Sequence, residues 1–164
     1  MSPAKEKQFE ALLARHKGIL YKIARSYSYC NEDRRDLIQD MTLQLWRSAE
    51  NYDPNFAQST WVYRIALNTA ISFLRSDMAR KNTFSSAEEV FVEAETQGGS
   101  EELMIQIQQL LQQLDKLDRA LMIMHLDGLD YDAIADVLNI SSSNVSTKLS
   151  RIKQKLAKEF NEEK

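Results

Sequence analysis

The chain of 164 residues has one cysteine, few glycines and prolines, and no long hydrophobic run. A single cysteine, Cys30, excludes an internal disulfide and a metal site of several thiolates, so nothing indicates an oxidising compartment. The longest apolar run, ALMIMHL at 120–126, contains His125 and is far too short to span a bilayer. The N-terminal sequence MSPAKEKQFE is charged, unlike a secretion signal. We therefore expect a cytoplasmic protein with no membrane insertion.

The composition predicts an all-α fold. Four glycines and two prolines occur in a chain rich in Leu, Ala, Met, Lys, Glu and Gln, which favours helices over strands and hairpins. Apolar residues at helical spacing predict helices in the first half of the chain at about residues 5–28, 36–48 and 61–76. The same spacing predicts helices in the second half at about residues 102–114, 117–126, 131–138 and 142–160.

A polar, acidic segment separates these two groups of helices. Residues 84–106 contain six acids and no base, and they include the pair Gly98 and Gly99. Such a composition is typical of an interdomain linker. We therefore expect two small helical domains, at 1–82 and 101–164, joined by a flexible acidic linker at 83–100.

The stretch LDYDAIADVLNISSSNVSTKLSRIKQKL, residues 129–156, predicts a helix-turn-helix. Asp130 and Ser141 each precede an apolar-periodic segment and are good N-caps. Asn139, between the two segments, is a residue type that tolerates the left-handed conformation of a tight turn. Acids occur only before this turn and bases only after it. The stretch therefore joins a supporting helix to a second helix that is free of acids.

The second helix of this motif has one apolar and one polar face. Its apolar stripe, which we expect to pack inward, consists of Val145, Leu149, Ile152 and Leu156. The other side carries Thr147, Ser150 and Arg151, whose side chains can reach base edges in a major groove while flanking lysines meet phosphates. The alternative is a helical hairpin whose lysines form a solvated face.

A group of aspartates around the supporting helix raises the question of a metal site. The group consists of Asp127, Asp130, Asp132 and Asp136. Carboxylates are calcium ligands, but capping by Asp130 and solvation of the others is the favoured interpretation. We predict no metal and no cofactor.

The predicted third helix carries a second candidate surface for nucleic acid. One face, expected to be exposed to solvent, holds Trp61, Arg64, Asn68, Ser72 and Arg75. Aromatic side chains stack on unpaired bases and arginines add cation–π contacts, so this face suits a single strand. The preceding loop, 52–60, offers aromatic and polar groups for a flipped base. The alternative is that Trp61 packs into the core.

The predicted second helix has Leu43 and Trp46 on its polar face. Exposed leucine and tryptophan rimmed by charge are typical of a protein interface. The alternative is simple packing of these two side chains against the first helix.

In their order and spacing, four stretches resemble a bacterial RNA polymerase sigma factor of the extracytoplasmic-function group, group 4 of the sigma-70 family. They are DLIQDMTLQLW, STWVYRIALNTA, LDRALMIMHLDGLDYDAIADVLNIS and NVSTKLSRIKQKL. The resemblance covers nearly the whole chain. It implies that residues 1–82 are a region 2 that opens the minus-10 promoter element, and that residues 101–164 are a region 4 that reads the minus-35 element.

The resemblance also implies three binding surfaces and several partners. The residues implied to bind the clamp helices of the polymerase's largest subunit are Asp36, Gln39, Asp40, Leu43 and Trp46. Those implied to take up the minus-10 strand are Asn55, Phe56, Ser59, Trp61, Arg64, Asn68 and Arg75. Those implied to dock at the minus-35 element are Ser142, Ser143, Asn144, Ser146, Thr147, Lys148, Ser150, Arg151 and Lys155. The flap region of core RNA polymerase and an anti-sigma factor are further implied partners.

Some residues depart from the family's common pattern. Asn139 stands where glycine is usual, and Asp115 stands where proline is frequent. Ser146 and Ser150 stand where larger or basic residues often occur. These departures bear on the promoter sequence and not on the fold.

Other functions remain open on the residues alone. One is a dimeric helix-turn-helix regulator that acts without polymerase, and another is a helical adaptor that binds only protein. An enzyme is not expected, because there is no phosphate-binding loop, His16 and His125 are isolated, and Cys30 lacks a recognisable base.

Overall fold

The structure, a computed structural model, describes residues 3–83 and 101–162. Within these ranges all regular secondary structure is helical, which confirms the predicted all-α class. The chain divides into two compact units, residues 1–91 and 92–164. Of the linker predicted at 83–100, residues 84–100 lie outside the described part of the chain.

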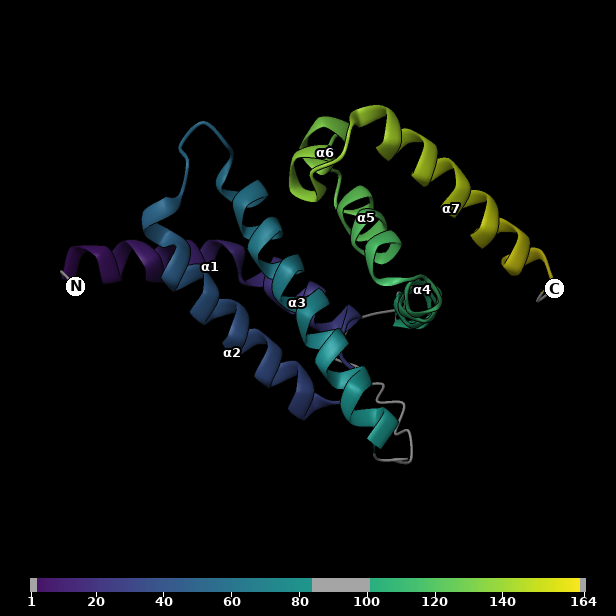
Figure 1. The fold of residues 1–164 in the computed structure, drawn as a ribbon, viewed down its shortest axis with the longest axis horizontal. Coiled ribbons are helices and arrows are strands. Elements are labelled where there is room, and N and C mark those ends of the chain that lie inside the picture. The colour runs from purple at the N-terminus through teal and green to yellow at the C-terminus, as the bar shows by residue number, and fades with distance from the viewer. Residues whose placement is uncertain (1–2, 84–100, 163–164) are drawn as a thin grey trace. The chain divides into compact units, whose positions relative to one another are not determined.

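The N-terminal unit consists of three long helices, α1 (Pro3–Ser26), α2 (Asn31–Ser48) and α3 (Gln58–Thr83), with the short 3-10 helix η1 (Ala49–Asn51) after α2. Figure 1 shows α2 and α3 running side by side in opposite directions, and α1 contacts both. Their shared core is apolar and includes the fully buried residues Ile23, Leu37, Met41, Leu45, Val62 and Leu67. This core holds the loop between α2 and α3 at one end of the pair.

Two helix starts differ from the sequence prediction. Helix α3 begins at Gln58, whereas the apolar pattern predicts a start at Trp61. The first turn of the helix is polar, so the sequence has no hydrophobic period there that would predict the earlier start. Helix α2 begins at Asn31, and its N-cap is Cys30. The Cys30 thiol accepts a weak hydrogen bond from the backbone N–H of Asp33, with an N···S distance of 3.5 Å. The segment NEDRRD therefore forms the first turns of α2.

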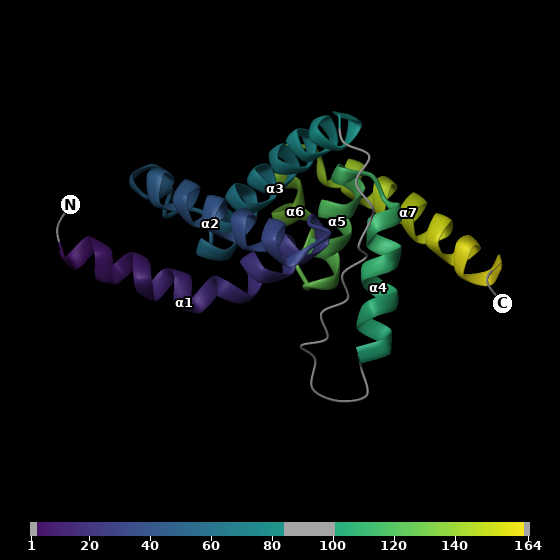
Figure 2. The ribbon, with the colours of Figure 1, turned by 90° about the horizontal axis from the view of Figure 1, so that it is seen from below.

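The C-terminal unit consists of α4 (Glu101–Gln113), α5 (Lys116–Leu126), α6 (Tyr131–Leu138) and α7 (Ser142–Glu162). Helices α5, α6 and α7 pack against one another, as Figures 1 and 2 show. Their common core includes Ile123, Met124, Ile134, Val145, Leu149 and Ile152. The apolar stripe predicted for the second helix of the motif is thus buried, except that Leu156 is half-buried.

A buried arginine joins α4 to α5. Arg119 is 4% exposed, and its Nε donates to the carbonyl of Leu111 at 3.0 Å. Its Nη2 donates to the carbonyls of Gln112 at 3.2 Å and Leu114 at 3.1 Å. The guanidinium therefore donates to carbonyls at the end of α4, where a helix lacks part of its backbone hydrogen bonds; that of Leu111 also accepts from the N–H of Leu114 at 3.1 Å.

Asp115, which departs from the family's common pattern, is the N-cap of α5. Its Oδ1 accepts hydrogen bonds from the backbone N–H groups of Leu117 at 3.1 Å and Asp118 at 2.8 Å. An aspartate can cap a helix in this way and proline cannot, so the replacement suits the start of α5.

The turns of the helix-turn-helix have the predicted chemistry. Asp130 caps α6 by accepting from the N–H of Ala133 at 2.8 Å, and Ser141 Oγ accepts from the N–H of Asn144 at 3.1 Å. Asn139 has φ 57° and ψ 47°, the left-handed conformation expected between the two helices. Gly128, between α5 and α6, has φ 87°.

Substitution at Asn139 tests this turn. We expect Asn139→Val to destabilise the C-terminal unit by about 1–3 kcal/mol, because a β-branched side chain is strained at positive φ. Asn139→Gly should leave the stability unchanged or slightly raised. Amide hydrogen exchange of α6 and α7 in the full chain measures both. Equal loss in the two variants would contradict the role of the left-handed conformation.

Candidate nucleic-acid interface

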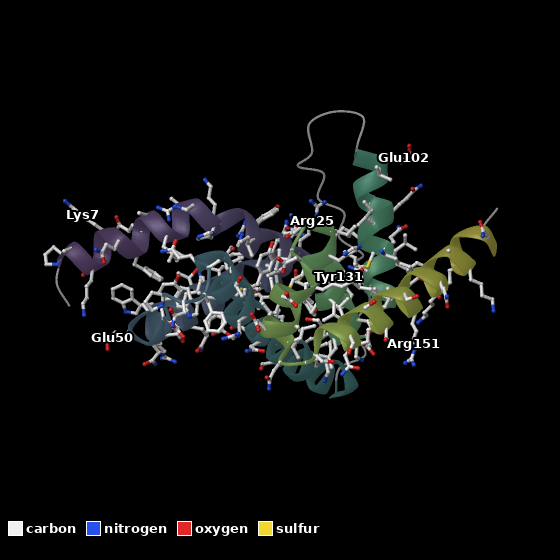
Figure 3. The ribbon with its side chains drawn as sticks, turned by 90° about the horizontal axis from the view of Figure 1, so that it is seen from above. Lys7, Arg25, Glu50, Glu102, Tyr131 and Arg151 are labelled. Atoms are coloured by element: carbon white, nitrogen blue, oxygen red, sulfur yellow. The ribbon has the colours of Figure 1, made fainter. Side chains whose placement is uncertain are left out.

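The outer face of α7 carries the polar side chains predicted to read DNA. With Val145, Leu149 and Ile152 buried, the opposite side of the helix faces solvent. The predicted minus-35 residues that are exposed there are Ser143, Asn144, Ser146, Thr147, Ser150, Arg151 and Lys155, while Ser142 and Lys148 are half-buried. Figure 3 shows Arg151 pointing outward from α7. No acid interrupts this face between Ser142 and Lys158.

The start of α7 contains a set of hydroxyl hydrogen bonds. Ser142 Oγ donates to Asp132 Oδ1 of α6 at 2.5 Å. Ser141 Oγ and Ser143 Oγ lie 3.3 Å apart, within hydrogen-bond distance. Thr147 Oγ1 donates to the carbonyl of Ser143 at 3.0 Å. Several side chains of the candidate reading face are therefore already oriented by the protein.

Two lysines at the edge of this face lie near an acid of α5. Burial raises the pKa of Asp118, and the neighbouring Asp115 raises it further, while Lys148 and Lys155 lower it. Both lysines of α7 therefore lie within electrostatic reach of this acid of α5. On α5, burial lowers the pKa of His125, and the charge of Lys153 lowers it further.

The residues of α2 that are predicted to bind the polymerase, which we call the α2 surface, are only partly exposed. Asp36, Gln39 and Asp40 are exposed, and Leu43 is 43% exposed. Trp46, however, is half-buried against Phe9 of α1, with ring centroids 4.9 Å apart in an edge-to-face arrangement. The expectation of an exposed Trp46 is therefore corrected, because α1 covers this side chain.

The expectation that Trp61 lies on the solvent side of α3 is wrong. Trp61 is 8% exposed, and its ring lies 5.3 Å from the ring of Tyr52. A helical wheel assigns Trp61 to the polar face, but the loop before α3 folds over that end of the helix. Arg64 is half-buried, whereas Asn68 and Ser72 are exposed as expected. The side chain of Arg75 lies outside the described residues.

The loop between α2 and α3 is ordered by its own contacts. Tyr52 Oη donates to the carbonyl of Phe56 at 2.7 Å, and the N–H of Asn55 donates to Asp53 Oδ1 at 2.9 Å. The guanidinium carbon of Arg64 lies 5.4 Å from the centre of the Phe56 ring. Asn55 is exposed and Phe56 is half-buried. The loop thus presents an amide and an aromatic ring beside an arginine.

Two further contacts concern the start of α3. Arg15 of α1 donates from Nη1 to Gln58 Oε1 at 2.9 Å, which ties the first turn of α3 to α1. Ser59, one of the predicted minus-10 residues, is half-buried in the same turn. Arg15 was not among the predicted site residues, since no motif marks it, whereas Tyr52 belongs to the loop predicted to receive a flipped base.

Within residues 3–83 and 101–162, no three His, Cys, Asp or Glu side chains lie close enough to share a metal ion. None of the helices described for this chain combines the length and apolar content needed to cross a membrane.

Comparison with protein families gives two matches in the order expected. Residues 12–80 match the model of sigma-70 region 2, and residues 104–156 match the model described as "Sigma-70, region 4". Each match falls within one of the two compact units.

Curated relatives and solved structures agree with these matches. The chain is 28% identical over 151 residues to the ECF RNA polymerase sigma factor SigM of Mycobacterium tuberculosis, covering 92% of this chain and 76% of the relative. It is 25% identical over 163 residues to the ECF RNA polymerase sigma-E factor of Escherichia coli, covering 91% and 84%.

Two solved structures share the fold. The sigma factor RpoE of Bartonella quintana, crystallised with the anti-sigma factor NepR, has a TM-score of 0.77 at 20% identity, covering 93% of this chain and 96% of that one. CnrH, in complex with the cytosolic domain of CnrY, has a TM-score of 0.72 at 22% identity, covering 97% and 91%. Because both sigma-70 regions match in order and the relatives are ECF sigma factors, the chain belongs to the extracytoplasmic-function group of RNA polymerase sigma factors.

Proposed function

We propose that this sigma factor directs core RNA polymerase to promoters through a minus-35 contact by α7 and a minus-10 contact by the loop 52–57 and α3. Sigma factors act with RNA polymerase in transcription initiation and are not enzymes. In this proposal residues 1–82 act at the minus-10 element, residues 101–164 act at the minus-35 element, and residues 83–100 link them. The acid-free outer face of α7 is the observation that carries it.

The minus-35 contact is supported by the shape and charge of α7. Its buried stripe fixes which side faces outward, and a helix is narrow enough to enter a major groove. The proposed base-facing residues are Ser142, Ser143, Asn144, Ser146, Thr147, Ser150 and Arg151. Lys148 and Lys155 are the proposed phosphate contacts, because each adds a positive charge to the same acid-free helix.

The minus-10 contact is supported by the loop before α3, with one change of role. Because Trp61 is buried, we assign the stacking on an unpaired base to Phe56 and the support of the loop to Trp61 and Tyr52. Asn55 offers an exposed amide to a base edge, and Arg64 beside the ring adds positive charge for the strand. Ser59, Asn68 and Arg75 remain proposed strand contacts.

The α2 surface is the proposed contact with the clamp helices of the polymerase's largest subunit. Leu43 supplies exposed apolar area, ringed by Asp36, Gln39 and Asp40, with Trp46 anchored at its edge by Phe9. The flap region of the polymerase is proposed to bind the C-terminal unit. RpoE was solved with the anti-sigma factor NepR, and CnrH with the cytosolic domain of CnrY, and we propose that an anti-sigma factor likewise binds this chain.

Reconstituted transcription tests this function. On genomic DNA, core polymerase with the added chain should start transcripts that core polymerase alone does not start. Two spaced sequence elements should lie upstream of each of these transcript starts. Arg151→Glu should reduce these transcripts by about tenfold or more, since it replaces a base-reading cation by an acid. Lys153→Glu makes the same charge change on the same helix outside the proposed minus-35 set, and it should have a smaller effect.

The alternatives give other results. A polymerase-independent regulator would bind a palindromic site without polymerase, and transcript starts would not depend on the added chain. A protein-binding adaptor would keep its full activity in the Arg151→Glu variant. Either outcome would overturn the proposal.

A further inference from the structure

An exposed acid of the supporting helix holds the first side chain of the reading helix. Asp132 of α6 accepts a hydrogen bond from Ser142 Oγ, the first residue of α7, at 2.5 Å. This distance is in the range of a strong bond between a hydroxyl and a carboxylate. From the sequence alone Asp132 is expected only to be solvated, so the bond gives this acid a specific partner.

Neither helix needs this bond for its cap. Asp130 already caps α6 through the N–H of Ala133, and Ser141 already caps α7 through the N–H of Asn144. Asp132 is itself exposed, so it does not fill space in the core. The contact between Asp132 and Ser142 is therefore additional to what the fold requires locally, and its effect falls on the orientation of Ser142.

The direction of the bond decides what Ser142 can offer to DNA. A serine hydroxyl has one proton and two lone pairs, and a carboxylate can only accept. The proton of Ser142 is therefore directed to Asp132, and its remaining capacity is that of an acceptor. Thr147 is in the same state, because its hydroxyl proton is directed to the carbonyl of Ser143.

We propose that Asp132 is a specificity-determining positioning residue: it fixes Ser142 as a hydrogen-bond acceptor, so that Ser142 selects a base with a major-groove amino group. In the major groove adenine N6 and cytosine N4 carry such donors, whereas guanine and thymine present acceptors. This inference rests on the proposed function of α7 as the reader of the minus-35 element.

The same geometry predicts an opposite effect on affinity. Asp132 is a negative charge beside a helix that is proposed to lie against phosphates, so it weakens binding to every sequence alike. Removing the carboxylate should therefore raise total binding while it lowers discrimination at one base pair. A residue with only a structural role would lower both together.

The test uses holoenzyme and a set of promoters with single base-pair changes across the minus-35 element. For the wild type, we expect one base pair at which adenine or cytosine on the contacted strand is preferred by about threefold to tenfold. Ser142→Ala and Asp132→Ala should each reduce that preference to below about twofold, and the double variant should show no further loss. Asp132→Asn, whose amide oxygen still accepts, should retain it.

Total binding separates the charge effect from the positioning effect. Asp132→Ala should raise binding to all promoters by about twofold at low salt. Asp136→Ala removes the same charge from the same helix, and it should leave the base preference intact. A preference that survives in Asp132→Ala, or a preference for guanine or thymine at the Ser142 base pair, would overturn the inference. Absence of transcription from every promoter would overturn the proposed function instead, and this inference with it.

Discussion

Phe56→Ala is expected to slow promoter opening by about tenfold to a hundredfold, because stacking of one base on an aromatic ring contributes about 1–3 kcal/mol. Phe56 lies in the loop before α3, its carbonyl is held by Tyr52, and Arg64 lies against its ring. The loss should appear in the opening step, because binding at the minus-35 element involves only the C-terminal unit in the proposed function. Fluorescence of 2-aminopurine in the minus-10 element measures the rate of opening.

Tyr29→Ala is the matched control for Phe56→Ala. Tyr29 is an exposed aromatic of the same unit, in the turn between α1 and α2, and it is not among the proposed minus-10 residues. Its removal should leave the opening rate close to that of the wild type. Wild-type opening by the Phe56→Ala holoenzyme, or an equal slowing by both variants, would remove Phe56 from the proposed stacking role.

Arg119→Met is expected to destabilise the C-terminal unit by about 2–4 kcal/mol. Three carbonyls at the end of α4 accept from this buried guanidinium, and methionine would leave all of them without that donor. Arg119→Lys should recover only part of the loss, since one ammonium group cannot match the planar fork of a guanidinium. Hydrogen exchange of α4 and α5 in the full chain, with chemical denaturation, measures the effect.

Lys155→Met is the control for Arg119→Met, because it removes an exposed charge from the same unit. Its free energy of unfolding should change by less than about 0.5 kcal/mol. Unchanged exchange rates in α4 after Arg119→Met would show that the guanidinium does not hold the end of that helix.

Local patterns in the sequence were sufficient for the helices and for the helix-turn-helix. The apolar period predicted each of the α-helices in the described residues, although not the 3-10 helix η1. The caps Asp130 and Ser141 and the left-handed Asn139 depend only on neighbours along the chain. Each of these features is set within a few residues, where side-chain chemistry and backbone preference act directly. The sequence pattern misplaced the helix starts that lack such a signal, at Asn31 and Gln58.

Exposure of the two tryptophans could not be predicted in the same way. Trp46 and Trp61 both lie on the polar side of their helices by period, yet one packs on Phe9 and the other on Tyr52. Their partners come from another helix and from a loop. A helical wheel represents a single helix, so it cannot predict that these side chains are covered. The stacking role therefore moves from Trp61 to Phe56 in the proposed function.

By itself, the sequence determined that this protein is all-helical, that its second half contains a helix-turn-helix, and that its ordered motifs resemble an ECF sigma factor. Only the tertiary structure decided which aromatic side chains remain exposed, that Arg119 closes the end of α4, and that Asp132 holds Ser142. The physical reason is the separation along the chain of the residues that interact. Period, capping and turn chemistry act between near neighbours, whereas burial and these side-chain bonds arise when separate elements pack together.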